Sequence, residues 1–169
     1  MQQRGEFRVS VTKDNLVFSS AHFITFAGHR CEGLHGHNYR AHVTVEGALD
    51  TEAWFVFDFV VLKGIMKRLC DEIDHKVLLP LESRRVQVVE EGECVKVAVD
   101  SKPRYVFPRN DCALLPIPNT TVEMLAELLT DRLRAELETM GARGVTAIEM
   151  DIEENFGQSA VFRVRLDTD

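Results

Sequence analysis

The sequence predicts an α+β fold in which two helices cover one face of an antiparallel sheet. Strand-like segments come first and last along the chain, and two segments with helical spacing lie between them. This order of elements is typical of helices gathered on one side of an antiparallel sheet. With 169 residues and no internal repeat, the chain is expected to form one domain over residues 1–169 that buries its core without disulfides.

Five segments have the composition of strands: residues 7–11, 16–24, 39–46, 146–153 and 160–166. The third alternates strictly between apolar and polar side chains. Because successive side chains of a strand point to opposite faces, this alternation predicts a strand with one face in the core.

Two helices are predicted from apolar side chains that recur every three or four residues. The first follows Asp58, a favourable N-cap, and its apolar stripe runs over residues 62–73. The second follows Thr120 and Thr121, either of which can cap it. Glu123 stands where it can close a capping box with Thr120.

An insertion, about residues 81–116, separates the two helices and is too long for a plain connection inside a compact domain. Residues 85–89 and 95–99 flank a polar turn, which predicts an inserted hairpin followed by a loop. The basic side chains of the insertion are expected on ordinary charged surface unless it folds over the functional site: Arg84, Arg85, Lys102 and Arg104.

Composition excludes several classes of function. The formal net charge of −7 argues against nucleic acid or an anionic membrane as the main partner. No run of apolar residues is long enough to span a bilayer, and the N-terminal residues lack the apolar core of a signal peptide. The four cysteines are widely spaced, so a reducing cytoplasm is the simplest expected location.

The most informative segment runs from Cys31 to His37, with His22 a few residues upstream. His35 and His37 are two residues apart and therefore share one face of a strand. A neighbouring strand can bring His22 alongside them. Three imidazoles with an open fourth position are typical of catalytic zinc, whereas Cys31 as a fourth ligand would make the site structural.

Two further polar pairs are candidates for function. Asp74 and His75 follow the first helix, and such a pair either performs acid–base chemistry or places a histidine at a helix C-terminus. Glu153 and Glu154 end a strand, so one points inward and the other toward solvent. An inward carboxylate can accept two hydrogen bonds from a guanine or pterin ring, although a solvated pair is the simpler interpretation.

These residues together resemble the 6-pyruvoyl-tetrahydropterin synthase and 6-carboxytetrahydropterin synthase family. The resemblance covers nearly the whole chain in order, except for the insertion. Its landmarks are Phe18-Ser19-Ser20-Ala21-His22, Cys31 separated by three residues from His35-Gly36-His37-Asn38-Tyr39, Phe57-Asp58-Phe59, Ile73-Asp74-His75, Pro118-Asn119-Thr120-Thr121-Val122-Glu123, and Glu154 before Phe162.

The resemblance implies a tunnelling fold, with a four-stranded antiparallel sheet backed by two helices. It implies subunits joined into barrels as a homohexamer of two stacked trimers, with sites at subunit interfaces. The implied substrate is the small-molecule pterin 7,8-dihydroneopterin triphosphate, and the implied cofactor is zinc, Zn²⁺.

The resemblance also implies roles for individual residues. The implied zinc ligands are His22, His35 and His37. The implied catalytic residues are Cys31 as general base and the proton-relay pair Asp74 and His75. The implied substrate-binding residues are Glu154, which anchors the pterin ring, with Thr120 and Thr121.

The spacing of three residues between Cys31 and His35 resembles the carboxy branch, which serves queuosine synthesis and releases acetaldehyde and triphosphate. The alternative is the pyruvoyl branch of tetrahydrobiopterin synthesis, in which triphosphate is eliminated. Glu32 resembles a third group, which uses a glutamate near this position to cleave the same substrate toward a folate precursor. Two non-enzymatic alternatives stay open: a structural zinc module and a pterin- or purine-binding module.

Overall fold

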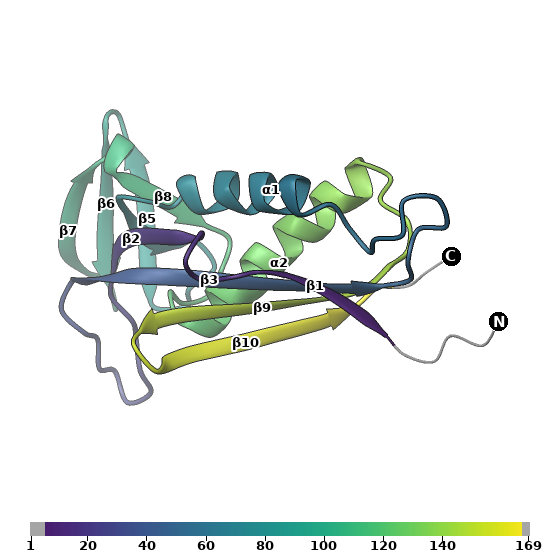
Figure 1. The fold of residues 1–169 in the computed structure, drawn as a ribbon. Coiled ribbons are helices and arrows are strands. Elements are labelled where there is room, and N and C mark those ends of the chain that lie inside the picture. Colours follow the sequence, from purple (N-terminus) through teal and green to yellow (C-terminus); the bar gives the residue numbers. More distant parts are fainter. Residues whose placement is uncertain (1–5, 167–169) are drawn as a thin grey trace.

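In the computed structural model, which describes residues 6–166, two helices cover one face of a large sheet (Figure 1). The elements of the main body are β1 (Phe7–Val11), β2 (Val17–His22), β3 (His35–Gly47), α1 (Phe59–Asp71), β4 (Lys76–Pro80), β8 (Cys112–Leu115), α2 (Val122–Thr139), β9 (Val145–Asn155) and β10 (Gln158–Arg165). The α+β class and the side on which both helices pack are therefore as predicted. Neither helix of the described part of the chain has the length and apolar character needed to cross a membrane.

The main sheet is larger than the four-stranded sheet that was expected. Its strands lie in the order β10-β9-β3-β2-β4-β8, and β1 also pairs with β3, which makes seven strands. The 13-residue strand β3 is long enough to pair with β2 along one half and with β1 along the other. The sheet grows further because β4 adds to β2 and β8 adds to β4, both as parallel strands.

The core lies between the sheet and the two helices. The alternation predicted for β3 is confirmed, since Tyr39, Ala41, Val43 and Val45 are all fully buried. They face the apolar stripes of α1 and α2 in one continuous cluster. The start of α1 is also as predicted, because the Asp58 carboxylate accepts hydrogen bonds from the first free amides of the helix.

The capping box predicted for α2 is wrong. The N-cap residue is Thr121, and its side chain makes no capping hydrogen bond. The hydroxyl of Thr120 instead donates to the carbonyl of Phe23 at 3.0 Å. Thr120 is completely buried against the end of β2, so its polar groups bind that strand rather than the helix.

The insertion contains more regular structure than the predicted hairpin and loop. The hairpin is present as β5 (Val86–Glu91) and β6 (Cys94–Val99), but β7 (Lys102–Pro108) then adds to β6. These three strands form a separate antiparallel sheet, and a short 3-10 turn leads from β7 into β8. The small sheet packs on the main body through its own apolar cluster, which includes Phe23, directly after β2, and Leu79 of β4.

Candidate functional site

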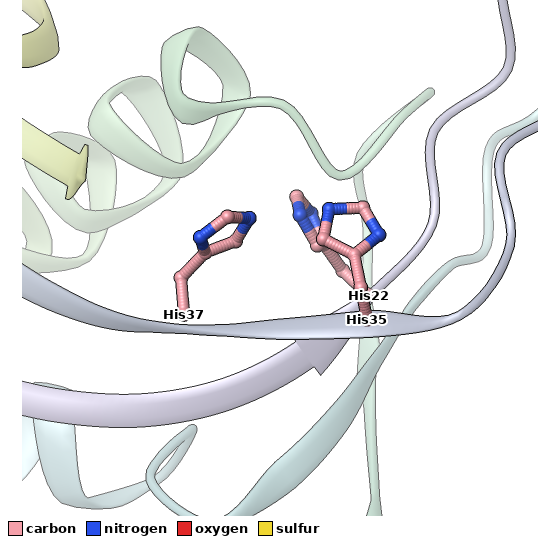
Figure 2. A group of neighbouring side chains, drawn as sticks. All are labelled: His22, His35 and His37. Atoms are coloured by element: carbon pink, nitrogen blue, oxygen red, sulfur yellow. The ribbon is translucent and has the colours of Figure 1, made fainter.

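Three imidazoles meet where β2 and β3 pair. His22 and His35 are direct cross-strand partners, and His37 lies two residues further along β3. All three side chains therefore stand on the same face of the sheet, as Figure 2 shows. Their candidate ligand atoms lie within 4.8 Å of one another. The predicted neighbourhood of His22 with the other two histidines is thus present in the fold.

Hydrogen bonds fix which ring nitrogens face the centre of this cluster. Nδ1 of His22 lies 2.7 Å from the Thr120 carbonyl, and Nδ1 of His35 lies 2.9 Å from the Gly33 carbonyl. Because a carbonyl only accepts, each Nδ1 carries the proton, and each Nε2 keeps a free lone pair. This is the tautomer that metal-ligating histidines need, and carbonyl partners of this kind hold ligands in orientation.

The Nε2 atom of His22 is buried without a hydrogen-bond partner. Its nearest charged neighbour is Oε1 of Glu154 at 3.3 Å, so two acceptors face each other. Such a pair needs a cation or a proton between its members. Burial lowers the pKa of His22 and disfavours the protonated ring, against the opposing effect of the Thr120 carbonyl. The three nitrogens therefore fit a metal ion.

Glu154 joins the cluster from the end of β9. The hydroxyl of Tyr39 donates to its Oε1 at 3.3 Å, and Nε2 of His37 lies 3.9 Å away. Burial and the charge of Glu154 raise the pKa of Tyr39, which keeps the phenol protonated as a donor. Glu153 points the other way and pairs with Lys13, so the two glutamates lie on opposite faces of β9 as predicted. The outward position in solvent is wrong, because the Glu153 side chain is only 13% exposed, against 25% for Glu154. Glu154 also lines a hollow of about 290 Å³.

Glu32, rather than Cys31, faces the histidines. Its Oε2 lies 3.8 Å from Nε2 of His35 and is buried without a hydrogen-bond partner. The Cys31 thiol instead packs against the apolar cluster of the insertion and lines a hollow with Arg104. Within the described residues the candidate metal group contains the three histidines and no thiol. This geometry does not form the closed four-ligand shell of a structural zinc site.

Asp74 and His75 form the predicted pair, but away from the three histidines. Oδ2 of Asp74 lies 2.8 Å from Nδ1 of His75, while Oδ1 accepts the amide of Ser19 at 2.7 Å. The Ser19 amide and the His75 ring hold the pKa of Asp74 below its usual range. The His75 side chain is 82% exposed, so the pair is presented outward from this chain.

The predicted substrate residues Thr120 and Thr121 differ in accessibility. Thr120 is fully buried, and its carbonyl and hydroxyl bind His22 and Phe23. It therefore orients His22 and is not exposed to a ligand. Thr121 is partly buried at the start of α2. Their contact with a substrate stays a prediction.

Sequence reasoning missed Tyr39 as a member of this site. The available signal was the alternation of β3, which places Tyr39 on the same face as His35 and His37. The orientation of Glu32 had no such signal because it lies in a loop, where no periodicity applies.

Comparisons with known proteins agree with this geometry. The family model described as 6-pyruvoyl tetrahydropterin synthase matches residues 10–165. A putative 6-carboxy-5,6,7,8-tetrahydropterin synthase from Methanocaldococcus jannaschii is 37% identical over 90% of this chain and 92% of the relative. The 6-pyruvoyl tetrahydropterin synthase of Plasmodium falciparum has a similar structure, with a TM-score of 0.88 and 29% identity over 96% of this chain and all of that chain.

Two structures of Plasmodium vivax 6-pyruvoyltetrahydropterin synthase are also similar, each with a TM-score of 0.87 and 27% identity over 96% of this chain and 99% of that chain. In these two proteins a glutamate described as a catalytic residue is replaced by alanine or by cysteine.

Replacing His37 by alanine should abolish stoichiometric zinc binding, because two imidazoles and one water hold zinc far less tightly than three imidazoles. Wild-type protein dialysed against zinc should retain about one ion per chain, measured by elemental mass spectrometry. The matched control is His42→Ala, on the opposite face of β3. Equal zinc content in His37→Ala and His42→Ala would show that these histidines are not the ligands.

Proposed function

Since the chain belongs to the 6-pyruvoyl tetrahydropterin synthase family, we propose that it is a zinc-dependent lyase for a pterin triphosphate. The proposed reaction converts 7,8-dihydroneopterin triphosphate and one water molecule to 6-carboxytetrahydropterin, acetaldehyde and triphosphate. The name of the Methanocaldococcus jannaschii relative and the spacing between Cys31 and His35 support this branch. The pyruvoyl branch remains the alternative within the same family, because the family model carries that name.

One observation carries the proposal more than any other. The Nε2 atom of His22 is buried without a partner and faces the same space as the ring nitrogens of His35 and His37. A protein gains nothing in stability from such an orphaned atom, because a buried polar group without a partner costs free energy. A zinc ion at this point would supply Lewis-acid chemistry that makes protons of the substrate side chain easier to remove.

The residues around the histidines have separate tasks in this proposal. The Glu154 carboxylate accepts N–H groups from the pterin ring, and the Tyr39 hydroxyl holds that carboxylate in place. Cys31 is the proposed general base for a proton of the substrate side chain, a role that requires its thiol to turn from the insertion toward the histidines. The Asp74 and His75 pair returns a proton, with Asp74 orienting the imidazole.

The outward position of His75 suggests that the pair serves a site on a neighbouring copy. We therefore propose a homohexamer with sites at subunit interfaces. The 82% exposure of the His75 side chain supports such an assembly, and so does the outer edge of β10, which pairs with no strand within residues 6–166. We also propose a cytoplasmic location, which the four free thiols support.

A second function has a specific observation in its favour. Glu32 points toward the histidines, and two similar structures carry substitutions of a glutamate described as catalytic. With Glu32 as base, the enzyme would cleave the same substrate toward a shortened, folate-type precursor. The two reactions differ in products and can therefore be separated directly.

Incubation of the zinc-loaded protein with 7,8-dihydroneopterin triphosphate should give 6-carboxytetrahydropterin and acetaldehyde, identified by mass spectrometry. A pyruvoyl product or a shortened folate-type product would assign the chain to one of the other branches. If a zinc-replete oligomer converts none of the substrate but binds it, the pterin-binding module becomes the better description.

The two candidate bases can be separated by product analysis of Cys31→Ala and Glu32→Gln. Removing a general base lowers turnover roughly 10²- to 10⁴-fold. We expect Cys31→Ala to suppress the carboxy product by this factor, and Glu32→Gln to suppress any folate-type product. Zinc content should be unchanged in Cys31→Ala; a loss of zinc there would instead indicate a structural thiolate ligand.

Replacing Glu154 by glutamine should weaken binding of dihydroneopterin roughly 10- to 100-fold, because hydrogen bonds to a charged group are lost. The measurement is isothermal titration calorimetry with the zinc-loaded protein. Glu153→Gln is the matched control, since its side chain pairs with Lys13 on the other face of β9. Unchanged affinity in Glu154→Gln would remove this residue from the pterin site.

A further inference from the structure

The loop between β2 and β3, residues 23–34, carries both candidate bases. It is a small hairpin, since Thr25 bridges to Cys31 and the amide of Glu32 donates to the Ile24 carbonyl at 3.0 Å. Its tip, residues 26–30, is exposed to solvent. Because the side chains at its tip are exposed, the loop makes few internal contacts that would fix its conformation.

The insertion contacts this loop through its backbone. The guanidinium of Arg104 donates to the Glu32 carbonyl at 2.6 Å. The hydroxyl of Tyr105 accepts the Leu34 amide at 3.2 Å. These two neighbouring residues of β7 therefore hold the backbone on both sides of Gly33, between the Glu32 carboxylate and the imidazole of His35. In Figure 1 the strands of the insertion lie at the same end of the molecule as this loop.

Arg85 holds the tip of the same loop. Its Nη1 donates to the carbonyls of Phe26 and Arg30, at 2.6 Å and 3.1 Å. The other side of the guanidinium binds both carboxylate oxygens of Asp100, at 2.8 Å and 2.6 Å. Asp100 occupies the turn between β6 and β7, so its carboxylate fixes the direction of the guanidinium.

The small sheet can act as a support for the loop because its apolar side chains pack against the main body. The ring of Tyr105 lies against the rings of Phe23 and Phe107, each with centroids 5.4 Å away. Val95 and Val97 of β6 are buried in the same cluster, together with Leu79 of the main sheet. The loop is therefore held against strands that are themselves fixed to the body of the protein.

We propose that the insertion is a clamp for the loop of residues 23–34, with Arg85, Arg104 and Tyr105 as positioning residues. They hold the backbone that carries both candidate bases in a fixed position beside the three histidines. The proposal rests on the proposed function, but it does not depend on the branch, because Cys31 and Glu32 both lie on the clamped loop.

The test uses the full-length, zinc-loaded protein and the variants Tyr105→Phe and Arg104→Ala. Tyr105→Phe removes only the hydroxyl and keeps the ring in its apolar cluster, so the fold is retained. Loosening a base by a fraction of an ångström should lower kcat about 10-fold or more, with KM within about twofold of the wild-type value. Zinc content should not change, because the clamp holds the loop and leaves the register of β2 and β3 intact.

A second readout does not depend on turnover. Hydrogen exchange at the Leu34 amide should become faster in Tyr105→Phe, while exchange in β6 stays unchanged. Arg104→Lys, which keeps a cationic donor, should recover part of the kcat lost in Arg104→Ala. The matched control is Lys96→Ala, because Lys96 pairs with Glu91 inside the insertion, and this variant should behave as the wild type.

An unchanged kcat in both variants would overturn the proposal, and so would a fall in kcat that follows a loss of zinc. If the wild-type protein converts no pterin substrate, the proposed function fails by itself. The clamp is then tested by hydrogen exchange alone. An unchanged exchange rate of the Leu34 amide in Tyr105→Phe would overturn it.

Discussion

The site depends on the antiparallel register of β2 and β3. Because His22 pairs directly with His35, the three histidines share one face of the sheet, and a slip of one residue would move His22 to the other face. Gly36 permits this close pairing, since a Cβ at that position would lie 3.2 Å from the backbone carbonyl of Ser20. The apolar alternation of β3 fixes the same register, so the residues that form the core also align the histidines.

Two residues before α2, Asn119 and Thr120, bind the site although they are distant from it in sequence. The Thr120 carbonyl lies 98 residues from His22 in sequence and sets the tautomer of its imidazole. The Asn119 side chain donates to the carbonyl of Thr25 at 3.0 Å and so holds the start of the loop between β2 and β3. Packing of α2 on the sheet is therefore coupled to the orientation of His22, one of the three candidate metal ligands. A substitution that disturbs the core at the start of α2 would therefore change the orientation of His22 and of the loop through these two hydrogen bonds.

Local patterns predicted most of the fold, and long-range pairing accounts for what they missed. The strand alternation and the Asp58 cap depend on neighbours in sequence, and both were predicted correctly. The parallel addition of β4 and β8 depends on contacts between distant segments, which periodicity does not encode. The histidine cluster was predictable because i and i+2 residues of a strand share a face. The sequence did not predict that Glu32 faces the histidines while Cys31 packs against the insertion. Side-chain directions in this loop depend on contacts with the insertion, which is distant in sequence.

The residues proposed for catalysis lie on two different surfaces of the chain. The histidines and Glu154 converge on the face that also packs against the helices, whereas the Asp74 and His75 pair is tied to Ser19 and exposed. The backbone of His75 is held in the left-handed region, with φ of 56°, and its amide donates to the Ser19 carbonyl at 2.6 Å. A non-glycine residue in this region is strained, and such strain persists where the surrounding structure fixes a side chain for use. An imidazole that is oriented by a carboxylate and left open to solvent is consistent with the proposed site at a subunit interface.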